Sequence, residues 1–125
     1  MVARVQNNGL ARITSLFTAA SWWLQWGTGS AAAASANVVT TTTTTEARTA
    51  ATMSQQTTTV TSDTMRATGT ITAAGARAIT EVGLFDAVGA ASPPTGGNMD
   101  VYGDFSVINL ATSDSIAFTI NVAFV

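Results

Sequence analysis

The chain has 125 residues, a formal net charge of −2, and neither cysteine nor histidine. Its length is that of a single domain with a modest hydrophobic core. The missing cysteine and histidine exclude disulfide frameworks, zinc sites built from thiolate or imidazole, and histidine-based catalytic triads. Lysine is absent and the five arginines are scattered, which argues against nucleic-acid binding because that needs a basic face to neutralise phosphates.

Charged residues make up only 10% of the chain, compared with about 25% in an average soluble domain. Threonine and alanine dominate instead. A surface of Thr, Ser, Asn and Ala is typical of extracellular β-proteins and virion shells, and it allows much of a chain to be buried between subunits. The composition therefore favours an oligomer over a monomer.

The first 30 residues contain all three tryptophans of the chain. The stretch 17–23 predicts an extended arm or strand, ended by the turn-forming residues 27–30. A short helix over residues 4–17 is the alternative, because several apolar side chains fall partly on one side of it, although the Asn-Asn-Gly of residues 7–9 interrupts the pattern. The apolar stretch 16–24 is shorter than the ~18 residues of a membrane span, so we expect no membrane association and no signal peptide.

The aromatic cluster in this region is the best candidate for a binding surface. Trp22 and Trp23 are adjacent, so in a strand they face opposite ways and one core cannot hold both. Tryptophan is also the residue most enriched at interface hot spots. We therefore expect a subunit or partner interface, with core packing and carbohydrate stacking as the alternatives, at the following residues: Phe17, Trp22, Trp23, Leu24 and Trp26.

Residues 31–56 are of low complexity, with an alanine run at 31–34 and a threonine run at 40–45. Alanine favours helix and β-branched threonine disfavours it, so the local preferences disagree. We predict an extended connection or a strand of weak register, with disorder in isolation as the alternative. Residues 1–56 are thus expected to form an N-terminal arm and connection, and a folded core is expected to survive deletion of residues 1–30.

Residues 57–125 predict a run of antiparallel strands. Strands are expected at 63–73, 77–87, 101–110 and 116–125, separated by turns at 74–77 and 111–114 and an exposed Pro- and Gly-rich loop at 89–98. In the last strand, large apolar residues alternate with small or polar ones, which is typical of a strand with one buried face: Ile116, Phe118, Ile120, Val122 and Phe124. The predicted fold is an all-β antiparallel sandwich or jelly-roll-like domain with an extended N-terminal arm.

The carboxylates do not form a recognised catalytic or metal-binding pattern. Asp100, Asp104 and Asp114 are the candidates for a hard-cation site, but their spacing fits turn and strand-end acceptors of backbone N–H groups better. Glu81 and Asp86 fall on opposite faces of one strand and cannot act as a pair. If Glu81 is partly buried, an arginine partner is expected, Arg66 or Arg77. We therefore expect no enzyme, no metal and no cofactor.

Several strand sequences together resemble a module of tailed-bacteriophage virion proteins. The stretch Ile79-Thr-Glu-Val-Gly-Leu-Phe-Asp-Ala87 follows Thr68-Gly-Thr-Ile-Thr72, and two later stretches match the strands that follow it in that module: Gly103-Asp-Phe-Ser-Val-Ile-Asn-Leu110 and Ser113-Asp-Ser-Ile-Ala-Phe-Thr119. Upstream, Trp26-Gly-Thr-Gly29 and Glu46-Ala-Arg48 also resemble the group. Related strands occur in tail-fibre attachment domains. The resemblance is firm over the final sixty or so residues.

The resemblance implies a β-rich shell or fibre component of the virion, often trimeric. We expect a capsid decoration (cement) protein that bridges capsid subunits, with the major capsid protein and further copies of itself as partners. Tail fibres are usually much longer, with shaft and receptor-binding parts, so a tail-fibre or baseplate adaptor is the first alternative. A small carbohydrate-binding module that uses the indoles is the second.

Overall fold

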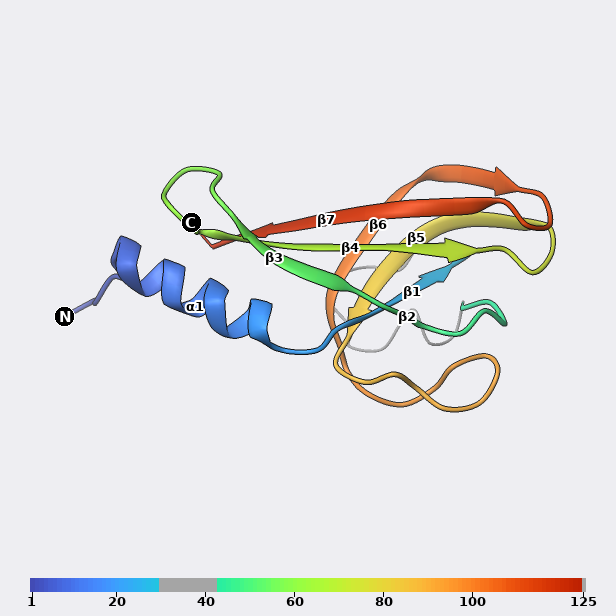
Figure 1. The fold of residues 1–125 in the computed structure, drawn as a ribbon, viewed down its shortest axis with the longest axis horizontal. Coiled ribbons are helices and arrows are strands. Elements are labelled where there is room, and N and C mark those ends of the chain that lie inside the picture. Colours follow the sequence, from blue (N-terminus) through green and yellow to red (C-terminus); the bar gives the residue numbers. More distant parts are fainter. Residues whose placement is uncertain (30–42, 125) are drawn as a thin grey trace.

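The computed structural model describes residues 1–29 and 43–124 (Figure 1). This part of the chain contains one helix and seven strands, in the order α1 (Asn7–Ala19), β1 (Trp23–Gly27), β2 (Thr49–Ala50), β3 (Thr52–Gln56), β4 (Thr64–Thr72), β5 (Arg77–Phe85), β6 (Met99–Leu110) and β7 (Ser115–Ala123). The strands form two antiparallel sheets. Sheet A has the order β2-β1-β5-β6, and sheet B has the order β3-β4-β7. The predicted all-β sandwich is confirmed.

The strands that the sequence predicts in the second half of the chain are all present, within a few residues of the expected bounds. β7 pairs with β4 over nine residues without a bulge, from Ser115 opposite Thr72 to Ala123 opposite Thr64. Its alternation is also as predicted: every second residue from Ser115 is exposed and the intervening ones are half-buried or buried. Phe118 is the one residue of β7 in the buried class, and β7 is the edge strand of sheet B.

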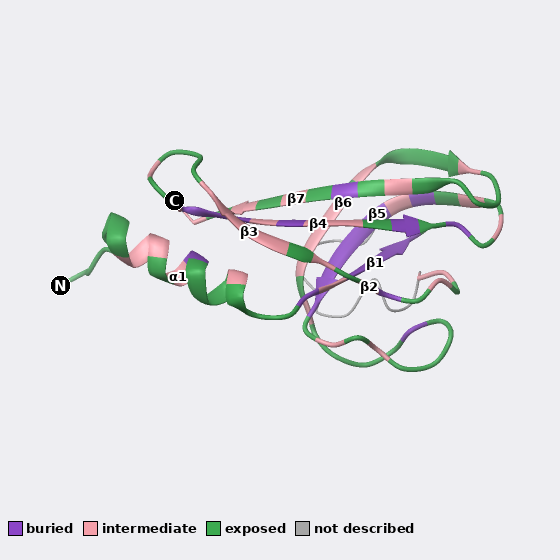
Figure 2. Cartoon of the chain, viewed as in Figure 1, coloured by how far each residue is buried: buried purple, intermediate pink, exposed green. Residues whose placement is uncertain are grey.

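The core lies between the two sheets. Sheet A contributes Leu24 and Trp26 from β1 and three apolar residues of β5, and sheet B contributes Phe118 and apolar residues of β4. The indole of Trp26 meets the ring of Phe118 edge-on, with 6.3 Å between the ring centroids. Figure 2 shows the buried residues concentrated on β1 and β5, the two interior strands of sheet A. A tryptophan in an interior strand buries more apolar area than any other single residue, so β1 anchors this core.

The two sides of the sandwich are built differently. On one side, β2 and β3 form nearly continuous chain: Ala50 pairs with Trp23 in sheet A, and two residues later Thr52 pairs with Thr68 in sheet B. The N–H of Ala51, between them, donates to the carbonyl of Trp22 at 2.8 Å. On the other side, β6 and β7 are the last strands of their sheets and are joined by a short turn at residues 111–114. This second side, the open side, ends in two unpaired strand edges within the described chain.

Residues 7–19 form helix α1 and not the extended arm that the sequence favoured; the alternative of a short helix is correct. The Asn-Asn-Gly that weakened the helix prediction lies in the first turn, where a single glycine costs only about 1 kcal/mol and packing offsets it. The helix packs against β3 and β4, and the side-chain amide of Gln55 donates to the carbonyl of Ala11 at 2.9 Å. In Figure 1 the helix lies alongside sheet B at the end that holds both chain termini.

Residues 23–27 and 49–56 are also not part of an arm. β1 lies between β2 and β5, and its five residues all pair with β5. Deletion of residues 1–30 would remove this interior strand, which supplies hydrogen bonds to both of its neighbours. Survival of a folded core after that deletion stays a prediction. The alanine run at 31–34 and most of the threonine run lie outside the described residues; Thr43 forms an isolated antiparallel bridge with Gly27.

We predict that Gly27→Ala destabilises the protein. A Cβ at Gly27 would collide with the carboxylate of Glu81, the residue opposite it in β5, and Glu81 is fully buried and cannot move aside. Overpacking of this kind typically costs about 1–3 kcal/mol. Gly103→Ala in β6 is the matched control, because a Cβ there meets nothing within 4 Å. Urea unfolding of both variants measures the difference, and equal stability of the two would contradict the prediction.

Candidate interaction surfaces

The five aromatic and apolar residues predicted to form an interface are divided among three environments. Leu24 and Trp26 are 0% and 1% exposed in the core, so neither has surface to offer a partner and the prediction is wrong for both. Trp23 is half-buried and lies opposite Phe85 in the register of sheet A. Phe17 and Trp22 lie together at the end of helix α1. The two adjacent indoles face opposite ways, as expected. Trp23 is nevertheless half-buried, on the face of sheet A that points away from the core between the sheets.

Phe17 and Trp22 line an open apolar groove with Leu16 and Ala20, of about 220 Å³. The ring of Phe17 stacks between those of Trp22 and Phe124, with centroid separations of 6.0 and 5.4 Å. The indole N–H of Trp22 donates to the carbonyl of Phe17 at 2.7 Å, which fixes the turn from helix to strand. Trp22 itself is only 5% exposed. The groove is therefore a rigid aromatic base with an accessible rim.

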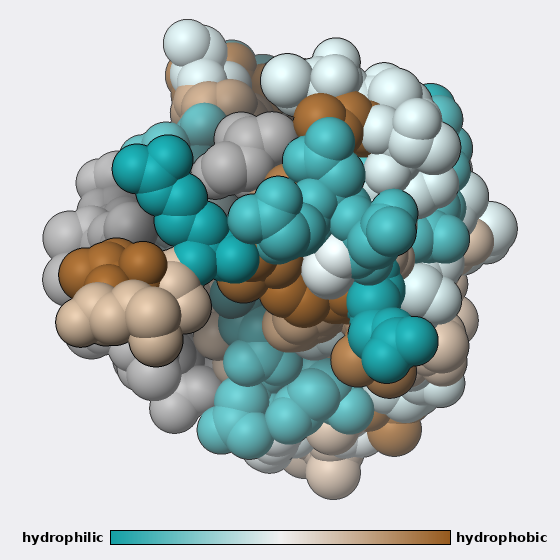
Figure 3. Space-filling model, turned by 90° about the vertical axis from the view of Figure 1, so that its left-hand side faces the viewer, coloured by the Kyte–Doolittle hydropathy of each residue, from teal (hydrophilic) through white to brown (hydrophobic). Residues whose placement is uncertain are grey.

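The rim of this groove is exposed to solvent. Figure 3 looks onto the end of the molecule where α1 lies and shows hydrophobic atoms at the surface among hydrophilic ones. Leu16 is 69% exposed and Phe17 is 39% exposed, and the apolar residues that precede the helix are exposed as well: Met1, Val2 and Val5. The exposed apolar side chains at the groove itself, Leu16 and Phe17, make it a candidate interaction site. We name the surface formed by Leu16, Phe17, Ala20 and Trp22 the helix groove.

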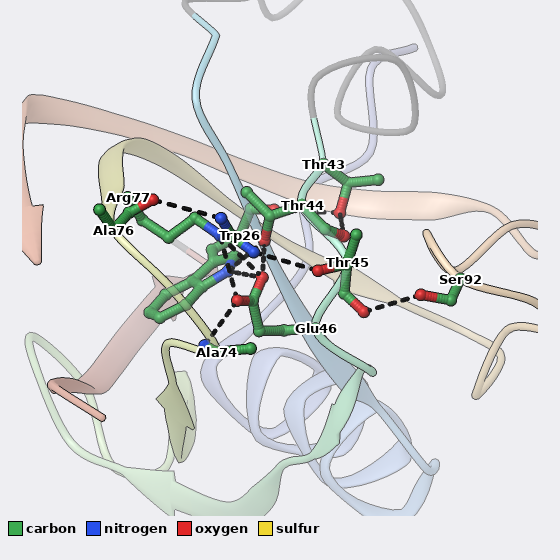
Figure 4. A network of polar contacts seen from close by, with 9 residues as sticks. All are labelled: Trp26, Thr43, Thr44, Thr45, Glu46, Ala74, Ala76, Arg77 and Ser92. Carbon is green, nitrogen blue, oxygen red and sulfur yellow. Dashed lines mark hydrogen bonds and ion pairs between the residues drawn. The ribbon is translucent and has the colours of Figure 1, made fainter. Parts of the chain in front are cut away.

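The indole N–H of Trp26 takes part in a hydrogen-bond network within the protein and is not available to a partner. Its indole N–H donates to the hydroxyl of Thr44 at 2.7 Å and, more weakly, to Glu46 at 3.4 Å. Figure 4 shows the carboxylate of Glu46 at the centre of this network, where it also accepts from Arg77 at 3.1 Å and from the N–H of Ala74 at 2.9 Å. The network ties residues 43–46 to β1 and to the turn between β4 and β5.

The hydrogen bonds to Glu46 lower the pKa of its carboxyl group. Burial raises the pKa of this carboxyl, but donation from Thr44, from the N–H of Ala74 and from Trp26 outweighs burial and lowers the pKa to about 2. Glu46 is therefore ionised throughout the ordinary pH range. It makes the ion pair with Arg77 that the sequence assigned to Glu81.

Glu81 is completely buried, whereas the sequence indicated partial burial. The prediction that it pairs with Arg66 or Arg77 is wrong. Its carboxylate accepts from the N–H of Gly29 at 3.1 Å and from the hydroxyl of Tyr102 at 3.0 Å. Arg77 bonds to Glu46, and Arg66 donates to Asn121 across β4 and β7 at 2.9 Å. The partners come from distant parts of the chain, so no local pattern could have identified them.

Asp114 accepts a hydrogen bond from the backbone N–H of Ala111 at 2.8 Å. The interpretation of this aspartate as a turn acceptor is therefore confirmed. Asp63 was not singled out in the sequence, yet it is fully buried. It accepts from the N–H groups of Val60, Thr58 and Thr59 at 2.8 to 2.9 Å, and the bond from Val60 above all holds its pKa well below the usual range. Within residues 1–29 and 43–124, no group of three or more acidic residues is placed to hold a metal ion.

The open side of the sandwich is the second candidate surface. Val107 and Ile108 of β6 are 54% and 40% exposed. Strand edges are normally protected by lysine, proline, bulges or short length, because an unpaired edge invites another strand. Neither β7 nor the second half of β6, residues 105–110, contains a charged residue or a proline. The lack of charged residues in these stretches can be seen in the sequence, but the position of β6 and β7 at the sheet edges cannot.

The lowered pKa of Glu46 predicts a loss of stability in acid. A carboxyl whose pKa is about 2 in the folded protein and near 4.5 in the unfolded chain stabilises the fold at neutral pH, and this contribution disappears as the pH falls from about 4.5 towards 2. The free energy of unfolding of Glu46→Gln should therefore fall less steeply over this range than that of the wild type. A wild-type slope in Glu46→Gln would contradict the prediction. Urea unfolding at stepped pH values measures the slope.

Comparisons of this chain with protein-family models, with curated proteins and with solved structures found no match. Within the described residues, no helix is both long enough and apolar enough to cross a membrane. The fold, the helix groove and the open side are therefore the observations from which a function can be inferred.

Proposed function

We propose that this protein is a non-enzymatic structural component of a tailed-bacteriophage particle, and specifically a trimeric capsid decoration protein that bridges subunits of the head. The proposal joins the sequence resemblance to the two surfaces described above. In it, the open side carries contacts between copies, and the helix groove carries contacts to the capsid.

The observation that carries the proposal is where the resembling segments lie. The stretches 79–87, 103–110 and 113–119 fall on β5, β6 and β7, which follow one another in the chain. Two of these strands supply the unprotected edges of the open side. The part of the chain that resembles virion proteins is thus also the part built to accept another strand, which supports a role in assembly.

Edge pairing offers a mechanism for self-association. A strand added to an exposed edge gains a ladder of backbone hydrogen bonds, while neighbouring side chains set its register. A cyclic trimer needs two different surfaces on each copy, because its contacts are heterologous. β6 and β7 provide two such edges, and neither β7 nor residues 105–110 of β6 contain a charged residue that would repel a second copy there.

The two alternatives draw on the same features. A tail-fibre or baseplate adaptor would have the same fold and the same edges, and it differs in where it sits on the particle. A carbohydrate-binding module would need exposed indole faces for stacking, and the burial of Trp22 and Trp26 leaves it only Trp23. We therefore favour the assembly role.

Cryo-electron microscopy of intact particles tests the location directly. Density for this chain over the capsid lattice, in numbers that scale with the major capsid protein, is the expected result. Density confined to the tail or baseplate would replace the head assignment with the adaptor. A purified chain that is monomeric at all concentrations and binds glycans on an array would overturn the assembly role altogether.

Val107→Lys is predicted to weaken the contact between copies. A lysine at this edge position places a charge beside the incoming strand, which is how natural edges avoid pairing. Val107 is 54% exposed, so the monomer fold should tolerate the change. Val88→Lys, at a position 59% exposed in the loop after β5, adds the same charge away from the edge and is the control. Light scattering coupled to size-exclusion chromatography should show a smaller assembly for Val107→Lys alone.

Leu16→Glu is predicted to weaken binding to the capsid without unfolding the protein. The side chain is 69% exposed at the rim of the helix groove, so a carboxylate there disrupts an apolar contact while leaving the helix intact. Ser15→Glu adds the same charge one residue earlier, at an exposed helix position that does not line the groove. Sedimentation with undecorated capsids measures binding. Equal binding by both variants would show that the groove is not the contact.

A further inference from the structure

The side-chain charges of this protein are divided unevenly along the chain. Residues 1–45 contain Arg4 and Arg12 and no acidic residue, so the formal charge of their side chains is +2. Residues 46–125 contain the other three arginines and all seven acidic residues, which gives −4 and accounts for the total of −2. Helix α1 and the helix groove therefore belong to the positive part of the chain.

Arg12 lies on the same face of α1 as the rim of the helix groove. It precedes Leu16 by four residues, so the two side chains are neighbours on the helix surface, about 6 Å apart along the helix axis. Arg12 is exposed. Within residues 1–29 and 43–124, the one ion pair closer than 4.0 Å joins Arg77 to Glu46, so the guanidinium of Arg12 has no carboxylate partner there.

The surroundings of the groove offer no exposed carboxylate to this guanidinium. The strands packed against α1 are β3 and β4, and neither contains an acidic residue. Asp63, just before β4, is fully buried, and its carboxylate accepts from the N–H groups of residues 58–60. In the groove itself, the carbonyl of Phe17 accepts from the indole N–H of Trp22 and from the N–H that caps the helix, so it is not free to attract a cation. The groove is thus apolar at its base and bounded by a positive charge on the side of Arg12.

We propose that the helix groove binds a segment of a partner protein in which one large apolar side chain lies next to a carboxylate. The apolar side chain fills the groove, whose volume of about 220 Å³ is large enough for one aliphatic or aromatic side chain. The carboxylate pairs with the guanidinium of Arg12, so that opposite charges meet beside the apolar contact. The proposed function assigns this groove to the capsid, so the proposal rests on that function and specifies the chemistry of the contact.

A membrane surface also attracts arginine beside exposed apolar residues, but the shape of the site favours a peptide. The base of the groove is formed by stacked aromatic rings, and its surface is hollowed to receive a side chain. A helix that lies in a lipid interface buries a whole apolar face in the lipid. Helix α1 instead has one face packed against β3 and β4.

Nuclear magnetic resonance titration of the isotope-labelled full chain tests this chemistry without the capsid. Three short synthetic peptides each carry one central phenylalanine, flanked by aspartate in the first, by serine in the second and by lysine in the third. The acidic peptide should bind most tightly and shift the signals of Arg12 and of the groove residues, and the basic peptide should bind most weakly. Equal binding of all three peptides, or shifts confined to other parts of the chain, would overturn the proposal.

Arg12→Gln should weaken binding of the acidic peptide about two- to fivefold, the effect expected of one partly exposed ion pair, and leave binding of the serine peptide unchanged. Glutamine favours the helix about as well as arginine, so α1 should persist. Arg66→Gln is the matched control. Arg66 lies between the core residues Met65 and Ala67, so its side chain points away from the core towards Asn121. This variant removes the same charge away from the groove and should bind as the wild type does. Tight binding of the acidic peptide by Arg12→Gln would overturn the ion pair.

Sedimentation with undecorated capsids at increasing salt separates this proposal from the proposed function. Capsid binding by the wild type should weaken as salt is added, and less steeply for Arg12→Gln, because salt screens exposed charges. Capsid binding that responds neither to salt nor to the substitution would keep the capsid role and overturn the acidic partner. Selective binding of the acidic peptide without any capsid binding would overturn the capsid role alone. Binding to vesicles of anionic phospholipid, but to none of the peptides, would replace the partner protein with a membrane.

Discussion

The packing of β1 between β2 and β5 is the constraint on which the rest of this structure depends. Leu24 and Trp26 of this strand fill the space between the two sheets, while Gln25 on its other face holds Arg48. One face of β1 therefore contacts the core between the sheets, and its other face contacts the buried Arg48. The network of Glu46 and the buried guanidinium both form around it, and each ties a chain segment between β1 and β3 to the sandwich.

The buried polar groups of this protein define its loops more than its sheets. Glu46 and Arg48 each gather donors or acceptors from several segments, whereas Asp63 gathers the N–H groups of residues 58–60 in its own loop. All three are largely shielded from water. In a chain with so few charges, each of these groups has few competing partners, so the arrangement of each network is specific. The surface, by contrast, has no charged residue along β7 and residues 105–110 of β6, where contacts between copies are proposed.

The helix α1 and the open side give the molecule two apolar surfaces of different character. The helix groove has a fixed aromatic base and can hold an apolar side chain, whereas the edges of β6 and β7 offer backbone groups. A protein that bridges subunits needs surfaces for two kinds of neighbour. The two surfaces are formed by the first 22 and the last 25 or so residues of the chain, with the core between them.

The sequence by itself determined the all-β class, the strands and turns of the second half, and the buried face of the last strand, because a period of two is a local property of a pleated chain. It left the helix of residues 7–19 as an alternative, since packing against β3 and β4 decided it. Only the tertiary structure showed that Trp26 and Leu24 are core residues, that Glu46 and not Glu81 pairs with Arg77, and that β6 and β7 are edges. Strand order and side-chain partners depend on contacts between residues far apart in the chain, and no local pattern records them.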